Sequence, residues 1–475
     1  MSLFLGFISI PKDNTIKVED LFKHINYLCS EQLKGRLSGS EGYELAAQYC
    51  QSRFKEYGLK SMLNNDNYYQ YLSVEYNDID KAEMQIIIDG KTTELKLGKD
   101  FICRGFTGSG NIKSDVVFCG YGISHEDYDD YKGVDVKNKI VMIFKQNPKW
   151  NINDKSFDAG YPRVKAENAF KHGAVGIILV SLPNDSEPQD IIGSVLHGPG
   201  EQNQNFPQVH ITIEAASKYF ESKGITLKEL QTKIDENKKP SSMDLNNQAV
   251  INIKAYYEGQ KRTMNVVGVL EGTDPKLKDE YIVIGAHLDH VGRQANIYFP
   301  GANDNASGSA AVLGIAEAFV KNNIKPKRSV IFVLFASEEQ GLFGAKAFAE
   351  NPPVPIERIS AMFNLDCIGF GDSIQIGNGK SAPQLWKIAK KNDNEKNINF
   401  MVENTWNGGG ADAQPFHEKG VPCIYFVTTN SYKHLHMLSD KPETLNKNLY
   451  EKIANLAYYT LVDVANYYNR EEIIK

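Results

Sequence analysis

Acidic and imidazole side chains follow several apolar runs in the C-terminal half of this 475-residue chain. The run "YIVIGA" is followed by two of them, and "SVIFVLFAS" by two adjacent glutamates. A single carboxylate at such a place usually caps a helix or meets solvent. Repetition of the pattern indicates a site, because clustered ionisable groups mark functional positions. The full set is His287, Asp289, Asp304, Glu338, Glu339, Asp366 and His436, with Asp440 four residues further on.

The segments that must position these side chains lie between about residues 256 and 475. Here apolar runs such as "ISAMFNLD" and "VPCIYFVTT" alternate with helical stretches such as "NASGSAAVLGIAEAFVKNN". Strands buried on both faces and alternating with helices predict an α/β fold, with a mixed, mostly parallel central sheet flanked by helices. Ligands of such sheets bind beyond the carboxyl ends of the strands. We therefore expect the acids and imidazoles to meet at one edge of this sheet.

The middle of the chain has a different pattern of apolar and turn-forming residues. Short strand-like runs such as "DVVFCGYGI" and "KIVMIF" stand between turn signals, without an obvious catalytic cluster. Two amphipathic helices precede this stretch, one over residues 18–34 and one that starts after Ser40. We therefore expect one domain made of residues 1–65 and 256–475, with a β-rich domain, residues 66–255, inserted into it.

The residue types point to a metal. Imidazole and carboxylate without thiolate suit zinc in a catalytic site rather than in a structural one. The ligands are too many for one tetrahedral ion, whereas two ions bridged by one carboxylate would use them all. None of the six cysteines forms a C-x-x-C pair, so a cysteine-based zinc or redox motif is not expected. Their spacing leaves a disulfide between Cys29 and Cys50 open.

At this point the motifs carry a resemblance. The segments "GAHLDH", "PGANDNASG", "ASEEQGLFG", "FNLDCIG" and "HMLSD" resemble the M28 family of co-catalytic zinc metallopeptidases. The stretches "YDDYKGVDVKNKIVMIF" and "AENAFKHGAVGIILV" resemble the protease-associated (PA) domain that is often inserted in this family. The resemblance implies two Zn²⁺ ions per chain and hydrolysis of the N-terminal residue of peptides, with a metal-bridging hydroxide as the nucleophile.

The resemblance also implies a role for each residue. The five metal ligands divide into a pair on one zinc, a pair on the other and a bridge between them: His287 and Asp366, Glu339 and His436, and Asp304. Glu338 would be the general base, which takes a proton from water and returns it to the leaving amine. Asp289 would hydrogen-bond to His287 and fix the tautomer and orientation of its ring.

The sequence departs from the family pattern before the last ligand. Leu435 stands where the family often has a tyrosine that stabilises the oxyanion. Tyr432 has the wrong spacing to replace it, and the zinc ions could polarise the carbonyl unaided. His434 competes with His436 for the ligand role, and the spacing to Asp440 favours His436.

Other residues near the motifs have weaker signals. Asp412 lies in "GGGADAQPF", which resembles a Ser-Asp loop of the family with Ala411 in place of serine, and a structural turn role is expected. For His290 we expect a supporting or surface position. Trp406 either lines a substrate pocket or simply packs. The remaining histidines outside the motifs are given no function: His125, His172, His197, His210 and His417.

Three other activities stay open. A carboxypeptidase or dipeptidase on the same metal site would need an arginine for the substrate carboxylate; Arg104, Arg163 and Arg293 are candidates, although each is expected at the surface. A glutaminyl cyclase-like acyltransferase works with a single zinc, which the five ligands disfavour. A binding homologue without catalysis should have lost ligands or the base, and this chain retains them.

Composition limits the classes of partner and location that the chain can have. The net charge of −6 argues against a nucleic-acid partner, and no apolar run reaches the eighteen residues of a membrane span. Peptides are the expected partners, and the oligomeric state stays open. The apolar start "MSLFLGFISI" fits a trimmed export signal, an expression scar or an edge strand. The family resemblance favours export to the periplasm or the extracellular space, with a cytoplasmic location as the alternative.

Overall fold

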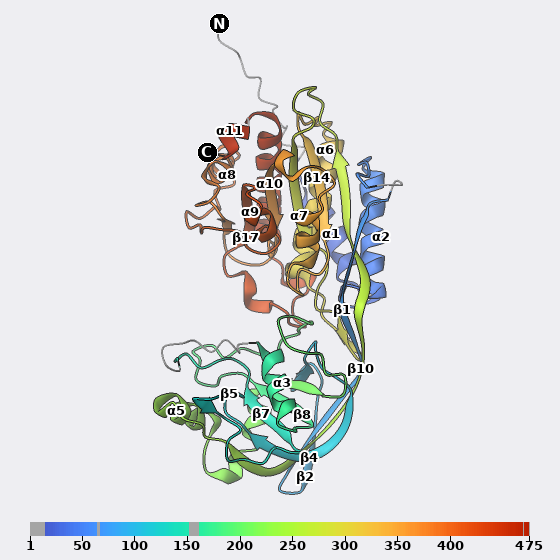
Figure 1. Ribbon diagram of the computed structural model, residues 1–475. Coiled ribbons are helices and arrows are strands. Elements are labelled where there is room, and N and C mark those ends of the chain that lie inside the picture. The colour runs from blue at the N-terminus through green and yellow to red at the C-terminus, as the bar shows by residue number, and fades with distance from the viewer. Residues whose placement is uncertain (1–14, 64–66, 152–160, 469, 475) are drawn as a thin grey trace. The chain divides into compact units, whose positions relative to one another are not determined.

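The computed structural model describes residues 15–63, 67–151, 161–468 and 470–474 (Figure 1). The N-terminal stretch "MSLFLGFISI" lies outside these residues. The chain divides into two compact units, called unit 1 and unit 2 below. Unit 1 comprises residues 1–74, 262–290 and 300–475, and unit 2 comprises residues 75–261 and 291–299. Two of the boundaries fall inside the long strands β1 (Tyr69–Ile88) and β10 (Met243–Leu270).

Six strands follow one another in the sheet of unit 1. Its strands run in the order β16 (Ile374–Gly377), β17 (Cys423–Thr428), β15 (Ile359–Leu365), β11 (Tyr281–His287), β14 (Ser329–Phe335) and the last part of β10. The four central strands are parallel, whereas β16 and β10 pair antiparallel at the two ends. Every residue of β14, β15 and β17 is buried. The predicted α/β class with a mostly parallel sheet is confirmed.

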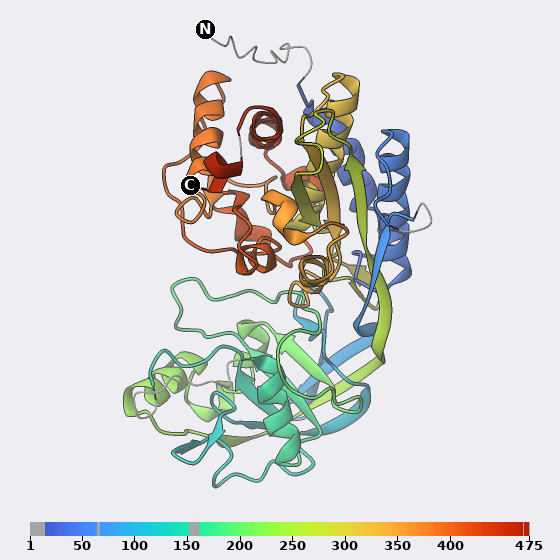
Figure 2. The same cartoon turned by 45° about the horizontal axis from the view of Figure 1, so that its top comes forward.

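Helices cover both faces of this sheet (Figure 2). Alternate residues explain how: Ile282 and Ile284 of β11 pack into one hydrophobic core, and Val283 packs into a second core on the opposite face. The first core is closed by α1 (Val18–Leu28), α2 (Glu41–Glu56), α6 (Gly308–Lys321), α8 (Pro383–Glu395) and α10 (Lys447–Asn466). The second core is closed by α7 (Phe343–Glu350) and α9 (Gln414–Glu418).

The N-terminal helices agree with the sequence in part. The helix predicted over residues 18–34 ends at Leu28, and a short 3₁₀ turn, Glu31–Leu33, follows it. Ser40 caps α2 as predicted, because its hydroxyl accepts a hydrogen bond from the backbone N–H of Tyr43. All six cysteines are free and buried, so no disulfide joins Cys29 to Cys50.

The sheet strands of unit 2 also have a parallel centre. Their path runs from the first part of β10 through β4 (Gly110–Phe118), β7 (Ile140–Phe144), β8 (Gly176–Val180) and β9 (Gln208–Ile211) to β3 (Phe101–Cys103). Strands β4, β7, β8 and β9 are parallel, and β3 is antiparallel to β9. Three helices accompany them: α3 (Pro162–Lys171), α4 (Ile213–Ser217) and α5 (Leu227–Asn237). The stretch predicted to be β-rich is therefore also an alternation of strands and helices.

Three small features complete unit 2. The strand β2 (Lys91–Leu95) forms a hairpin with β1 around Gly90. The strands β5 (Ser124–His125) and β6 (Tyr128–Asp129) pair with each other. The hairpin of β12 (Arg293–Gln294) and β13 (Ile297–Tyr298) joins β1 at Ile79. Over the described residues of both units, no helix has the length and apolar character needed to cross a membrane.

Candidate metal centre

Three neighbouring parallel strands of unit 1 deliver polar side chains at the same edge of the sheet. His287 is the last residue of β11, Glu338 and Glu339 come shortly after β14, and Asp366 comes directly after β15. Asp304 lies in the turn Ala302–Ser307 that leads into α6. Because parallel strands end at the same edge, the sequence spacing becomes spatial proximity.

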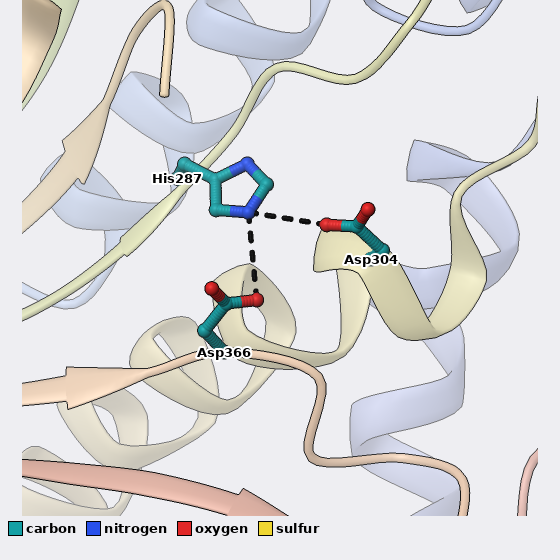
Figure 3. A group of neighbouring side chains, drawn as sticks. All are labelled: His287, Asp304 and Asp366. Carbon is teal, nitrogen blue, oxygen red and sulfur yellow. Dashed lines mark ion pairs between the residues drawn. The ribbon is translucent and has the colours of Figure 1, made fainter. Parts of the chain in front are cut away.

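One side-chain group is formed by His287, Asp304 and Asp366 (Figure 3). The Nε2 atom of His287 lies 3.2 Å from Oδ1 of Asp304 and 3.5 Å from Oδ1 of Asp366. All three residues are buried. Oδ1 of Asp366 has no hydrogen-bond partner, whereas its Oδ2 accepts a hydrogen bond from the hydroxyl of Tyr425 at 3.2 Å. A buried carboxylate oxygen without a donor, beside an imidazole nitrogen, fits a bound cation.

A second group shares Asp304. Nε2 of His436 lies 2.8 Å from Oε2 of Glu339 and 3.1 Å from Oδ2 of Asp304. Asp304 therefore points Oδ1 toward His287 and Oδ2 toward His436. One carboxylate with an oxygen directed to each group has the geometry of a bridging ligand. The structure thus brings together all five residues that the sequence proposed as metal ligands.

His290 joins the second group and does not lie at the surface. Its ring is fully buried, and Nδ1 lies 2.9 Å from Oε1 of Glu339 and 3.7 Å from Oδ2 of Asp304. The ring meets that of His436 edge-on, with 5.6 Å between the ring centres. The sequence left a supporting or a surface position open for His290, which ends the motif "GAHLDH", and the contact with Glu339 agrees with the supporting position.

Asp289 organises the turn that carries the two glutamates. The backbone N–H groups of Glu338 and Glu339 donate to its carboxylate oxygens at 3.1 and 3.4 Å. Nδ1 of His287 lies 3.1 Å from the backbone oxygen of Asp289 and 3.8 Å from its carboxylate. The close partner of His287 is thus the backbone of Asp289, while the carboxylate positions the glutamates.

The two adjacent glutamates have opposite electrostatic environments. Burial raises the pKa of Glu338 well above its usual value, and the charges of Asp412 and Glu339 add to this rise. Burial also acts to raise the pKa of Glu339, but the charge of His436 and hydrogen bonds with His290 and His436 together outweigh it and bring this pKa to about 2. A pair of carboxyl groups whose pKa values are pushed apart is suited to separate roles, one as proton carrier and one as ligand.

The pKa values of Asp304 and the two histidines are shifted so that acid and imidazole carry opposite charges. Burial acts to raise the pKa of Asp304, yet hydrogen bonds with His287 and His436 hold it well below its usual value. Burial acts to lower the pKa of both histidines. The carboxylate charges beside His287 and His436 outweigh this effect, so both pKa values lie well above the usual value.

Asp412 faces this cluster instead of only stabilising a turn. It is fully buried, and neither of its carboxylate oxygens has a hydrogen-bond partner. Burial raises its pKa well above its usual value, and the charge of His287 opposes this rise. The sequence showed an acid in a glycine-rich stretch that resembles a Ser-Asp loop of the family, but this did not indicate where the side chain points.

Two buried groups fix the loops of the centre. The carboxylate of Asp440 accepts hydrogen bonds from the backbone N–H groups of Asn303 and Asp304 at 2.8 and 3.0 Å. The fully buried guanidinium of Arg36 donates only to backbone carbonyls. These carbonyls belong to Leu28, Leu288, Pro300 and Gly301, at 2.5, 2.9, 2.8 and 3.1 Å. Arg36 therefore ties the segment before His290 to the one before Asp304, although it lies some 250 positions earlier in the chain.

Backbone strain gathers at the same place. Ser337, Cys367 and His436 have φ angles of 56°, 53° and 56°, in the left-handed region that is costly for residues other than glycine. The first two lie beside Glu338 and Asp366. Strained residues persist where the surrounding structure fixes them, and they cluster at functional sites.

The remaining aromatic and histidine candidates lie around the centre. Tyr432 is 56% exposed and hydrogen-bonds to Tyr425, which in turn contacts Asp366. Trp406 packs edge-on against Tyr425, with 5.8 Å between the ring centres. His434 pairs with the hydroxyl of Ser439 at 2.9 Å, so the structure favours His436 for the ligand position.

Comparison with known families agrees with this geometry. Residues 265–461 match the model of peptidase family M28, and residues 112–219 match the model of the PA domain. The chain therefore contains an M28-family region and a PA-domain region. The M28 match contains both side-chain groups of the centre.

Individual relatives are distant. A "Glutamate carboxypeptidase 2 homolog" of Caenorhabditis elegans is 22% identical over an alignment of 531 positions. The alignment covers 91% of this chain and 65% of that protein. "Aminopeptidase YwaD" of Bacillus subtilis is 25% identical over 240 residues, or 48% of this chain and 50% of that protein. The chain thus spans about half to two thirds of the length of these curated relatives. The structure of a zinc aminopeptidase from Bacillus subtilis superposes with a TM-score of 0.66, at 18% identity, over 97% of this chain and 98% of that one, which establishes the shared fold.

Proposed function

We propose that this protein is a di-zinc exopeptidase that removes the N-terminal residue of peptides. The observation that carries the proposal is Asp304, whose two oxygens point to two separate groups of ligands. The groups would hold one zinc ion at His287, Asp304 and Asp366, and another at Asp304, Glu339 and His436. Zinc is supported by the donor set of imidazole and carboxylate and by the zinc aminopeptidase of the same fold.

Glu338 is the proposed general base. Bound zinc would polarise the scissile carbonyl and make water acidic near neutral pH. Glu338 follows the strand that positions Glu339, and its backbone is held by Asp289. Its carboxyl group takes a proton from the attacking water and delivers it to the leaving amine nitrogen. The raised pKa of Glu338 matches a group that must both accept and donate a proton.

Aminopeptidase activity is preferred over carboxypeptidase activity because of what surrounds the ligands. Asp412 presents two buried carboxylate oxygens without a partner, which suit a substrate ammonium group rather than a carboxylate. Two of the arginines considered for a carboxylate clamp are already paired. Arg163 forms two hydrogen bonds of 2.9 Å with Glu75, and Arg293 lies 2.6 Å from Asp78.

A hydrolysis panel tests this function. Peptides with a free N-terminus, an acetylated N-terminus or an amidated C-terminus are incubated with the protein, with chelator, and with chelator followed by zinc. We expect cleavage only of peptides with a free N-terminus, lost with chelator and restored by zinc. Cleavage that ignores acetylation but is blocked by amidation would replace the proposal with a carboxypeptidase.

A further inference from the structure

Unit 2 contains a second group of buried ionisable side chains that the proposed peptidase chemistry does not use. It consists of Arg104, Lys145 and His210, called the cationic cluster below. All three are buried: Arg104 is 6% exposed, Lys145 7% and His210 0%. The sequence had suggested a surface position for Arg104 and no function for His210, so the cluster emerges only from the fold.

The strand register places the three side chains on one face of the sheet. In a row across the strands, Ile143 pairs with Leu179, Leu179 with His210, and His210 with Ile102. Lys145 comes directly after β7 and Arg104 directly after β3, each two residues beyond the row, and residues two apart share a face. Because β3 is antiparallel to β9, the two cations lie beyond opposite sides of the row. His210 therefore lies between them. The positive charges also lower the pKa values of their neighbours. Burial, followed by the charge of Arg104, lowers the pKa of Lys145 to about 6. Burial, Lys145 and Arg104 hold that of His210 well below its usual value.

The cluster has buried nitrogen atoms without hydrogen-bond partners. Nε and Nη1 of Arg104 are buried and have no hydrogen-bond partner, and neither has Nδ1 of His210. Nε2 of His210 pairs with the hydroxyl of Ser181 at 3.0 Å, and the ammonium of Lys145 donates to the side-chain oxygen of Gln189. The nearest ring to Arg104 is that of Phe106, with 5.5 Å between the guanidinium carbon and the ring centre. A buried guanidinium without a counter-ion is costly, and burying it is favourable only when an anion completes the site.

The other two arginines of unit 2 have the acidic partner that Arg104 lacks. Arg163 is as deeply buried as Arg104, yet Glu75 neutralises it through two hydrogen bonds. Arg293 has Asp78. Arg104 alone among these three has no acidic partner. The backbone around it is nonetheless held firmly, because the side-chain amide of Gln294 bonds to both the N–H and the C=O of Cys103, at 2.8 Å each.

We propose that the cationic cluster is a carboxylate-binding site of unit 2, in which Arg104 supplies the charge and Lys145 and His210 supply further donors. The ligand class is a carboxylate, because two buried guanidinium nitrogens of Arg104 have no partner and a planar guanidinium matches the geometry of a carboxylate. Guanidinium recognises carboxylate geometry through several hydrogen bonds at once. This inference is independent of the peptidase activity proposed above.

Calorimetry with small anions tests the site in the intact protein. N-acetylglycine is titrated into the wild type, Arg104→Gln and Lys113→Gln, an exposed lysine of β4 that serves as the control. N-acetylglycinamide and sulfate are titrated into the wild type. The metal centre is the same in all three proteins, so carboxylate binding to it cancels in the comparison. We expect binding to weaken at least tenfold in Arg104→Gln only, with no binding of the amide and weaker binding of sulfate. Equal binding by wild type and Arg104→Gln would overturn the site, and equal affinity for sulfate would overturn the carboxylate assignment.

The melting temperature separates a binding role from a structural one. In buffer with only chloride as the anion, Arg104→Gln should melt at the same temperature as the wild type or higher, because it removes an unneutralised buried cation. Adding N-acetylglycine should raise the melting temperature of the wild type and leave that of the variant unchanged. A variant that melts lower, with the same response to the ligand as the wild type, would show that Arg104 is structural. Lys145→Met, which leaves Arg104 in place, should weaken binding less than Arg104→Gln; a larger loss would contradict the leading role of Arg104.

Discussion

Unit 1 and unit 2 share an alternation of parallel strands and helices, but their buried polar side chains have opposite character. In unit 1 the residues at the strand ends are His287, Glu338 and Asp366, and acids outnumber imidazoles. In unit 2, Lys145 follows β7 at the carboxyl edge of the parallel strands, whereas Arg104 follows β3, which runs antiparallel to β9 and ends toward the other edge. The difference teaches that the sheet provides a place for chemistry, whereas the residues that end each strand decide which ligand fits there.

The largest effect is expected from Glu338→Gln in unit 1. Glutamine keeps the size of the side chain but cannot carry the proton, so turnover of a free N-terminal peptide should fall by about 10²–10⁴-fold. The zinc content should stay the same, because Glu338 is not among the proposed ligands. Initial rates and metal analysis on the same sample measure both quantities. Glu94→Gln, at an exposed position of β2, is the matched control, and full activity in Glu338→Gln would contradict the assignment.

A second prediction compares Asp304, which faces both side-chain groups of the centre, with Asp366, which belongs to one of them. Asp304→Asn should weaken zinc binding at both groups, because each oxygen of Asp304 faces one of them. Asp366→Asn should weaken only the group that contains His287. Mass spectrometry of metal content after gel filtration distinguishes the two outcomes. The bridging role would be wrong if Asp304→Asn retained one zinc ion as firmly as the wild type.

His290→Ser should have a smaller effect. The ring contacts Glu339 and Asp304 in the second group, and loss of a residue that orients a ligand typically weakens metal affinity by about 10–100-fold. Competition with a fluorescent chelator should show this loss for one of the two ions. His125→Ser, at an exposed position of unit 2, should change neither ion. A two-ion profile identical to the wild type would mean that His290 only fills space.

The last effect belongs to unit 2 and is a change of stability with pH. Lys145 has a pKa of about 6 in the folded protein and about 10.5 when exposed, so the unfolded chain binds more protons between these values. Stability contributed at this position therefore rises as the pH increases from 6 toward 10, and it is lowest below pH 6. Lys145→Met removes this dependence and should flatten the rise in melting temperature between pH 6 and pH 9. The exposed change Lys113→Met should leave the slope unaltered, and an unchanged slope in Lys145→Met would show that the lysine stays charged.

The sequence predicted the centre of unit 1 well because its signal is local. An apolar run that ends in an acid or an imidazole identifies both the strand and the edge at which it ends, so His287, Asp366 and the two glutamates could be placed together. Asp304 could be placed because the small-residue helix that follows it is also recognisable. The class of the fold followed from the same runs.

The burial and the partners of the other polar residues could not be predicted, because they depend on residues that are distant in the sequence. Arg36 reaches carbonyls more than 250 positions away, and nothing in its own neighbourhood indicates that it is buried. Asp412 and His290 resemble ordinary loop residues until the fold turns them toward the ligands. Arg104 and Arg163 look alike in the sequence, and only the fold shows that Glu75 neutralises one of them and that the other has no partner.

The central claim is that Asp304 bridges two zinc ions, and anomalous diffraction at the zinc edge from zinc-loaded crystals tests it most directly. We predict two anomalous peaks separated by about 3.5–4 Å, the spacing of two-metal sites. One should lie among His287, Asp304 and Asp366, and the other among Asp304, Glu339 and His436. A single peak, or two peaks that do not share Asp304, would contradict the account.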